Sequence, residues 1–221
     1  MFFSRRVLSV VPLLAMLAGC SIGGGDSRSA RNVSDEVRRP GLNSPEVRQC
    51  LVDLGQSGVR FQVLDDRSFG GGCSARGAVK LLDIGTPVTN LGAMTCPLAS
   101  RFAGWVRYGV VPASRQLLGS EVVRVESFGT YSCRGVNGVA SNRLSEHASA
   151  NAVDIAAFVL ADGRRISVKA DWNSPDPATR RFLRTIHSSA CRRFQTVLSP
   201  DYNAAHHDHF HMDMGRGPFC R

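Results

Sequence analysis

The chain has 221 residues, and its 27 Lys and Arg outnumber its 18 Asp and Glu, which gives a formal net charge of +9. A basic chain favours an anionic partner, but no basic stripe interleaved with aromatic residues occurs, so nucleic acid is not the expected partner. Residues 44–221 are numerous enough to form one domain with a sizeable core.

The first twenty residues are typical of a secretory signal. Arg5 and Arg6 precede an apolar run over residues 7–17, which is too short to span a bilayer. The segment Leu17-Ala-Gly-Cys20 resembles the lipobox of bacterial lipoproteins, in which the cysteine is lipidated and becomes the mature N-terminus. We therefore expect residues 1–19 to be removed and Cys20 to anchor a periplasm-facing lipoprotein, at the outer membrane. An ordinary cleaved signal with an incidental cysteine is the alternative.

Residues 20–43 are rich in Gly, Ser and Arg and offer little to bury, so we expect a flexible linker after the lipidated N-terminus. Loss of the leader removes two arginines and no acidic residue, which lowers the formal charge from +9 to +7. The polyanions that such an exported chain meets are envelope polymers and anionic lipids. The folded domain is expected over residues 44–221.

Hydrophobic periodicity and punctuation by proline and glycine predict both helices and strands in the domain. Loops are expected over residues 65–73 and 112–120. The expected elements, in chain order, are a helix from Pro45, strands over 59–64 and 78–84, a helix over 97–108, extended segments over 122–126 and 130–134, a hairpin of 153–160 with 165–171, a helix from Pro177, and strands over 196–198 and 209–214. This order predicts an α+β fold, an antiparallel sheet with flanking helices, whose late strands carry the polar residues of interest.

Six cysteines follow the lipobox, and their even number in an exported chain predicts up to three disulfides. A zinc–thiolate site is the alternative, but no Cys-x-x-Cys pair occurs and an oxidising compartment disfavours free thiolates. The sequence does not determine the pairing. The six are Cys50, Cys73, Cys96, Cys133, Cys191 and Cys220.

Two polar segments near the C-terminal end hold the residues best suited to bind a metal. We expect His147 on a loop and Asp154 at the start of a strand, so that the loop brings the two together. His209 and His211 are two apart on an extended segment and point to the same face. Catalytic zinc sites commonly use three His or carboxylate ligands and leave a fourth position for water. The pattern predicts Zn²⁺ held by His147, Asp154 and His211, with His209 placed to take or return a proton.

The pattern Ser145-x-His147-x6-Asp154, followed by His209-x-His211, resembles the metallopeptidases that cut peptidoglycan peptides. That group contains D-Ala-D-Ala carboxypeptidases, murein endopeptidases, lysostaphin-type enzymes and the zinc-bearing hedgehog domain. The resemblance implies the same three ligands and an assisting role for His209. It also implies a zinc site on an antiparallel sheet.

More closely, residues 50–220 resemble the bacterial extensin-like C-terminal domain family, whose members are expected to share that peptidase fold. The resemblance rests on five segments spread along the domain. They are Met94-Thr-Cys-Pro97, Tyr131-Ser-Cys-Arg134, Ser145-Glu-His147, Ala152-Val-Asp154 and Asp208-His-Phe-His-Met-Asp213.

The resemblance also suggests substrate-binding and catalytic residues. The segment ending in Arg134 is similar to a Ser-Gly-Tyr-Arg segment whose arginine holds a substrate carbonyl or carboxylate, so we expect Arg134 and Ser145 to bind substrate. An ordinary surface arginine is the alternative. Related enzymes often use a glutamate base where this chain has Asp208, but Asp208 points away from His209 in a regular strand, so His209 is the preferred base. Ala150 replaces a usual glycine, a change that a negative φ would accommodate.

Simpler explanations apply to the other histidines. His206 and His207 are expected to be a solvated pair or outer partners of the ligands, and His187 to be a packed histidine on its helix. Asp213 is expected either to orient a ligand histidine or to end the strand in water.

Two functions follow. One is an exported zinc peptidase acting on peptidoglycan stem peptides or crosslinks, with specificity set by the loops 65–73 and 112–120. The other is a non-catalytic, zinc-stabilised lipoprotein that binds peptidoglycan or a partner.

Overall fold

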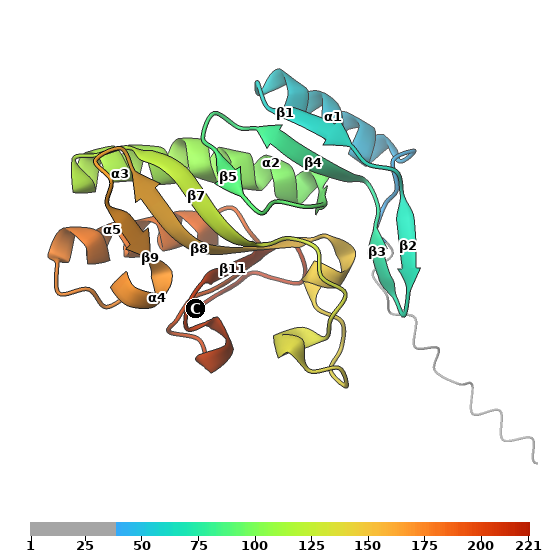
Figure 1. The fold of residues 1–221 in the computed structure, drawn as a ribbon. Coiled ribbons are helices and arrows are strands. Elements are labelled where there is room, and N and C mark those ends of the chain that lie inside the picture. Colours follow the sequence, from blue (N-terminus) through green and yellow to red (C-terminus); the bar gives the residue numbers. More distant parts are fainter. Residues whose placement is uncertain (1–38) are drawn as a thin grey trace, which may run out of the picture. The chain divides into compact units, whose positions relative to one another are not determined.

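The computed structural model describes residues 39–221, so the expected signal segment, Cys20 and most of the expected linker lie outside the described residues. The described residues form an α+β arrangement in which most neighbouring strands are antiparallel, as expected (Figure 1). Residues just before the predicted domain start at Ser44 also contact the folded part: the Leu42 N–H donates to the Asp66 carboxylate at 3.0 Å. Within residues 39–221, every helix is too short or too polar to cross a bilayer.

The helices begin where the capping residues predict. The Ser44 hydroxyl accepts the Val47 N–H at 3.2 Å, and the Asp176 carboxylate accepts the N–H groups of Ala178 and Thr179. The Trp105 indole donates to the Ile186 carbonyl at 3.0 Å and ties two helices together in the core. The α-helices are α1 Pro45–Gln56, α2 Cys96–Trp105, α3 Val111–Leu118, α4 Val168–Asp171 and α5 Pro177–Cys191.

The strands form a central sheet and two small ones. The central sheet has the order β12-β10-β11-β8-β7-β5, with β9 paired to β8, and only its β10–β12 and β5–β7 pairs are parallel. The small sheets are β1-β4-β6 and β2-β3. The strands are β1 Arg60–Val63, β2 Arg67–Gly70, β3 Cys73–Ala75, β4 Ala78–Asp83, β5 Val88–Thr89, β6 Met94–Thr95, β7 Val122–Gly129, β8 Ala152–Leu160, β9 Arg165–Ser167, β10 Thr196–Leu198, β11 Phe210–Asp213 and β12 Phe219–Cys220.

Alternation along β11 separates the core from the polar site. Phe210 and Met212 are fully buried in the hydrophobic core, and the Phe210 ring lies 5.6 Å from that of His187 on α5. His211 and Asp213 alternate with these two residues along the strand and therefore point to the opposite face. There, His211 pairs in register with Asp154 of β8. The site therefore lies on the side of β11 that faces away from α5.

Both predicted specificity loops contain regular structure, so those two expectations were wrong. Residues 67–75 form the β2–β3 hairpin, whose turn holds three consecutive glycines with positive φ, Gly70, Gly71 and Gly72. Residues 111–118 form α3, which continues from α2 through a π-helical turn over Val106–Val110. Pro112 fits there because the first turn of a helix does not need its N–H. The expected extended segment 130–134 contains no strand.

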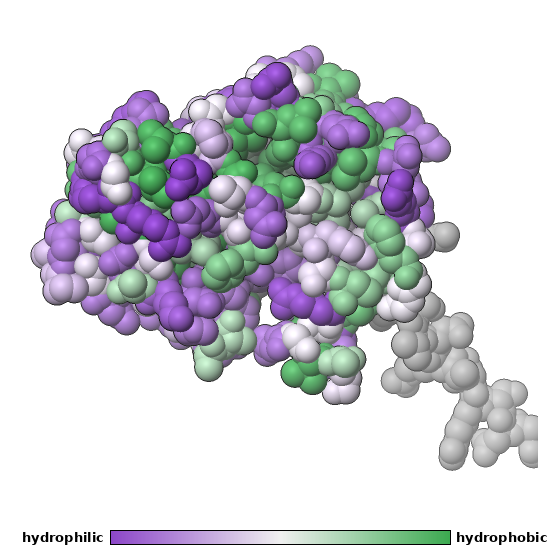
Figure 2. Space-filling view, in the orientation of Figure 1, coloured by the Kyte–Doolittle hydropathy of each residue, from purple (hydrophilic) through white to green (hydrophobic). Residues whose placement is uncertain are grey.

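On the face drawn in Figure 2, hydrophobic and hydrophilic side chains are interspersed. Large hydrophobic residues stay partly exposed at several separate places. Three of them, Phe128, Tyr202 and Phe219, line the cavities beside the polar site.

Candidate metal centre

A short 3-10 turn over Glu146–Ser149 positions His147. The Ser145 hydroxyl accepts the His147 N–H at 3.4 Å, and Ala150 closes the turn by donating its N–H to the His147 carbonyl at 3.2 Å. Ala150 does so at φ 55° and ψ 29°, in the left-handed region. A negative φ, the condition under which alanine would be accommodated without strain, is therefore not met, and glycine would adopt this backbone conformation more easily.

His147, Asp154 and His211 converge as predicted. The Asp154 carboxylate lies 3.0 Å from His147 Nε2 and 2.9 Å from His211 Nδ1, and the two nitrogens are 3.2 Å apart. All three side chains are buried. Two nitrogens and one carboxylate oxygen so close together form a group that can hold a metal ion.

The outer nitrogen of each histidine is already engaged. His147 Nδ1 lies 2.6 Å from the Thr130 carbonyl, which can only accept, so Nδ1 carries a hydrogen and Nε2 is the ring nitrogen that faces Asp154. His211 Nε2 donates to the Asp213 carboxylate at 2.9 Å, which leaves Nδ1 facing Asp154. Metal-binding histidines are commonly oriented by such outer hydrogen bonds, so the donor set fits a metal. Of the two roles considered for Asp213, the structure supports orientation of His211.

Without a metal ion, the group keeps a proton on His211. Burial lowers the pKa of His211, but its hydrogen bonds to Asp154 and Asp213 outweigh burial and raise that pKa to about 9. Burial raises the pKa of Asp154, but the hydrogen bonds from His147 and His211 outweigh burial and hold it far below its usual range. At neutral pH the structure therefore balances His211⁺ against two carboxylates.

His209 lies beside this group, just before β11 begins at Phe210. Its Nδ1 is 2.8 Å from the Asp208 carboxylate, and its Nε2 is 3.6 Å from the Asp154 carboxylate. Asp208 therefore contacts His209 rather than pointing away, because the chain is not yet a regular strand there. The pKa of Asp208 is raised by partial burial but lowered, on balance, by the His209 hydrogen bond.

Arg134 reaches the group from the segment after β7. Its guanidinium lies 3.3 Å from the Asp154 carboxylate and its side chain is 37% exposed. The preceding residue, Cys133, is bonded to Cys73 at the start of β3. The hairpin β2–β3 is therefore covalently attached next to Arg134.

Two cavities, of about 390 and 300 Å³, flank the group and share His147, His209 and Arg134 as lining residues. The larger also contains Ser145 and His206, and the smaller contains Asp208 and Asp154. The metal-binding group therefore borders two cavities.

Of the two roles expected for His206, solvation is wrong, and the structure places it beside the ligand histidines. Its side chain is 8% exposed and its ring lies 5.2 Å from that of His209 and 5.8 Å from that of His211. Burial, followed by the nearby charges of His211 and His209, lowers the pKa of His206 to about 4. His207 is exposed and contacts only its own turn and Asp208. The burial of His206 had no sequence signal, because it depends on how the turn before β11 folds back.

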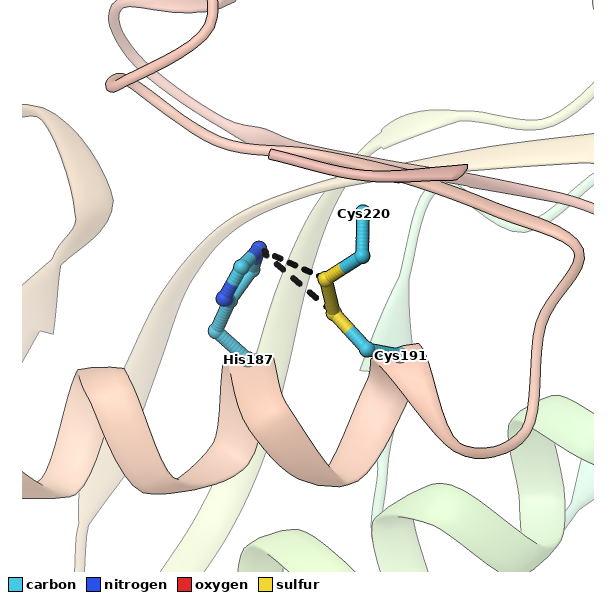
Figure 3. Close-up of side chains that lie close together, drawn as sticks. All are labelled: His187, Cys191 and Cys220. Atoms are coloured by element: carbon cyan, nitrogen blue, oxygen red, sulfur yellow. Dashed lines mark hydrogen bonds between the residues drawn. A yellow bond between two sulfur atoms is a disulfide. The ribbon is translucent and has the colours of Figure 1, made fainter. Parts of the chain in front are cut away.

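A second group of potential ligands, His187, Cys191 and Cys220, is drawn in Figure 3. His187 Nε2 lies 3.9 and 4.0 Å from the two sulfurs, but these sulfurs are joined as a disulfide. The His187 ring also packs against Trp172. The half-buried His187 is thus a packed histidine, as expected.

The predicted three disulfides are confirmed within the described residues. Cys50–Cys96 joins α1 to α2, Cys73–Cys133 joins β3 to the segment before Arg134, and Cys191–Cys220 joins α5 to β12. No thiolate remains for a zinc site among these six cysteines.

Comparison with known proteins gives one match. The family model described as extensin-like protein C-terminus matches residues 48–221. No curated protein and no solved structure matches the chain. The matched range contains every metal-binding and cavity-lining residue described above, and it covers most of the sequence. The chain therefore belongs to the extensin-like protein C-terminus family.

Proposed function

We propose that this protein is an exported zinc-dependent peptidase that acts on peptidoglycan stem peptides or crosslinks. The observation that carries the proposal is the buried group of His147, Asp154 and His211, in which outer hydrogen bonds hold each histidine with one ring nitrogen facing Asp154. Two imidazoles and one carboxylate are a common ligand set of catalytic zinc. A bound Zn²⁺ supplies Lewis acidity and lowers the pKa of water toward ~7.

The neighbouring residues are proposed to act on the peptide. His209 takes and returns the proton, because Asp208 fixes its Nδ1 hydrogen and leaves Nε2 directed toward the metal-binding group. Asp208 itself is the alternative base. Arg134 offers its guanidinium to a substrate carbonyl or carboxylate, and it lines both cavities. Ser145 lines the larger cavity, where it is proposed to contact substrate in addition to capping the His147 turn.

Kinship with the D-Ala-D-Ala metallopeptidase and hedgehog-like group is part of the same proposal. Its support is the spacing Ser145-x-His147-x6-Asp154 and His209-x-His211, which the fold brings to one place. The antiparallel pairing of β8 with β11 supplies Asp154 and His211 from adjacent strands.

The proposed location is the periplasmic face of the outer membrane, through acyl chains on Cys20. Its support is the lipobox-like segment ending in Cys20. Radioactive palmitate should label the expressed chain but not its Cys20→Ala variant, and equal labelling of both would exclude the anchor at this residue.

The peptidase proposal is tested by digestion of purified peptidoglycan with the chain lacking residues 1–19, with zinc and with a chelator. Mass spectrometry of the muropeptides should show zinc-dependent cleavage. His209→Ala should abolish cleavage with zinc still bound, whereas His211→Ala should lose both. His207→Ala is the matched control, since His207 is exposed and lines neither cavity.

A muropeptide profile that does not change on digestion would contradict the peptidase proposal. If peptidoglycan is nevertheless bound by the metal-loaded chain, a non-catalytic binding lipoprotein becomes the better description.

A further inference from the structure

We propose that His206 is a substrate-binding residue, whose Nε2 accepts a hydrogen bond from an amide N–H of the peptide in the larger cavity. The inference deepens the proposed peptidase function and rests on it. His206 does not belong to the metal-binding group, and the role proposed for it differs from the role of His209.

The hydrogen bonds of the turn before β11 fix the tautomer of His206. Asn203 begins the 3-10 turn Ala204–His206, and its Oδ1 accepts the Ala205 N–H at 3.0 Å. Because a backbone N–H donates to this atom of the Asn203 side chain, the atom is the amide oxygen and not the amide nitrogen. The same Oδ1 lies 2.7 Å from His206 Nδ1, so Nδ1 must donate to it. His206 Nε2 consequently carries the lone pair.

That lone pair is available. Within residues 39–221, His206 Nε2 makes no hydrogen bond to the protein, although the residue is only 8% exposed. The ring lines the larger cavity, between the Tyr202 ring at 5.6 Å and the His209 ring at 5.2 Å. An acceptor without a protein partner that faces a cavity is open to a ligand's donor.

The arrangement of His206 parallels that of His209 with one difference. Each histidine donates its Nδ1 hydrogen to a side-chain oxygen, but the oxygen belongs to a neutral amide for His206 and to the Asp208 carboxylate for His209. A carboxylate stabilises an imidazolium, whereas an amide does so far less. The two histidines are thus suited to different tasks: His209 exchanges a proton, and His206 remains a neutral acceptor.

The rest of the larger cavity supplies many donors and few free acceptors. Arg134, Arg143 and Arg216 line it and can only donate. Its two carboxylates are already engaged, Glu146 by Arg39 and Asn151, and Asp213 by His211 and the Gly215 N–H. A peptide presents both carbonyl and N–H groups, so its carbonyls and carboxylates meet the arginines and its N–H needs an acceptor such as His206 Nε2.

Kinetics with muropeptides test this role in the zinc-loaded chain lacking residues 1–19. His206→Ala should lower kcat/KM by roughly 10- to 100-fold, the effect expected for one lost hydrogen bond at a buried site. Zinc stoichiometry should not change, because His206 does not belong to the metal-binding group. His206→Gln, which can place an amide oxygen near the position of Nε2, should recover part of the loss, and His206→Asn should not.

His207→Ala is again the control and should behave as the wild type. Wild-type kcat/KM in His206→Ala would overturn the proposal. So would loss of zinc from that variant, because it would make His206 a ligand or a structural support.

A second readout separates this inference from the peptidase proposal. Nitrogen-15 NMR of the imidazoles reports the Nδ1–H tautomer of His206 and the shift of its Nε2 when muropeptide is added. A change at Nε2 supports the role even if the wild-type chain cleaves nothing, so the peptidase proposal can fail alone. An Nε2 signal that does not respond to muropeptide overturns the inference, whether or not cleavage occurs.

Discussion

Ala150 shows how one residue carries backbone strain next to a functional group. Its left-handed conformation costs an L-residue about 1–2 kcal/mol, yet its N–H and carbonyl both bond, to His147 and to the Thr95 N–H respectively. The methyl group is fully buried against Ala75 and Ala78. Burial of the methyl group and the two hydrogen bonds therefore offset the strain and keep the His147 turn closed.

Substitutions at Ala150 should separate strain from packing. Ala150→Gly removes the strain but loses a buried methyl, about 0.8 kcal/mol, and adds unfolded-state freedom, about 0.5–1 kcal/mol, so stability should stay within about 1 kcal/mol. Ala150→Val should cost at least about 2 kcal/mol, because a β-branched residue disfavours positive φ and overfills the site. Urea denaturation measures both; a valine variant as stable as the wild type would contradict this account.

His211 predicts how metal binding depends on pH. With a pKa near 9 in the metal-free fold, His211 must release a proton to bind a metal at neutral pH. The apparent metal affinity should therefore rise up to about tenfold per pH unit between about 6.5 and 9, and level off above. Competition with a chelator at several pH values measures it. Asp213→Asn, which removes one charge that raises this pKa, should move the plateau to lower pH, and His207→Ala should not.

The raised pKa of His211 also determines whether the metal-free protein becomes more or less stable as pH rises. Because the pKa of His211 is raised above the usual 6.5, its contribution is fully present below pH 6.5 and is lost as pH rises toward 9. Asp154, whose pKa is lowered, contributes above its usual value and loses this contribution as pH falls. Metal-free stability should therefore be highest on the mildly acidic side of neutrality.

At the scale of elements, those with strong local signals were predictable. Capping residues before Pro45 and Pro177 and the alternation of residues 209–214 gave α1, α5 and β11 nearly to the residue. The β2–β3 hairpin had no sequence signal, because β2 is exposed at all four positions and β3 is buried at all three, so neither short strand alternates between buried and exposed residues. The helix expected over residues 97–108 continues in the structure through Val106–Val110 into α3, where Pro112 lies in the first turn.

The disulfide Cys73–Cys133 links this overlooked hairpin to the segment that holds Arg134. Replacing both cysteines by alanine should lower the free energy of unfolding by about 2–4 kcal/mol. It should also weaken muropeptide binding, because Arg134 loses its anchored neighbour, while zinc stoichiometry stays at the wild-type value. The control is Cys50→Ala with Cys96→Ala, which cuts a link between α1 and α2. Equal muropeptide affinity in both double variants would contradict the role of the bond in placing Arg134.

At the scale of the whole molecule, the site depends on long-range pairing that a sequence read locally does not reveal. His147 and His211 are 64 residues apart, and they meet because β8 pairs with β11 and the Glu146–Ser149 turn folds over the pair. Spacing, residue type and the family resemblance together predicted the three residues that come together in a group able to hold a metal ion. The Thr130 carbonyl, the burial of His206 and the two cavities had no local signal, because each arises from segments brought together only in the fold.

This geometry also predicts how a metal affects the molecule as a whole. One ion would join the turn that holds His147 to β8 and β11, so zinc should stabilise the folded state and not the unfolded chain. At a free concentration of about 1,000 times Kd, the gain is about 4 kcal/mol, which for a chain of this size raises Tm by roughly 8–16 °C. Calorimetry of the chain lacking residues 1–19, with zinc and with chelator, measures the shift. His211→Ala should abolish it and His207→Ala should retain it, because only His211 belongs to the buried group; a shift of equal size in His211→Ala would place the stabilising ion elsewhere.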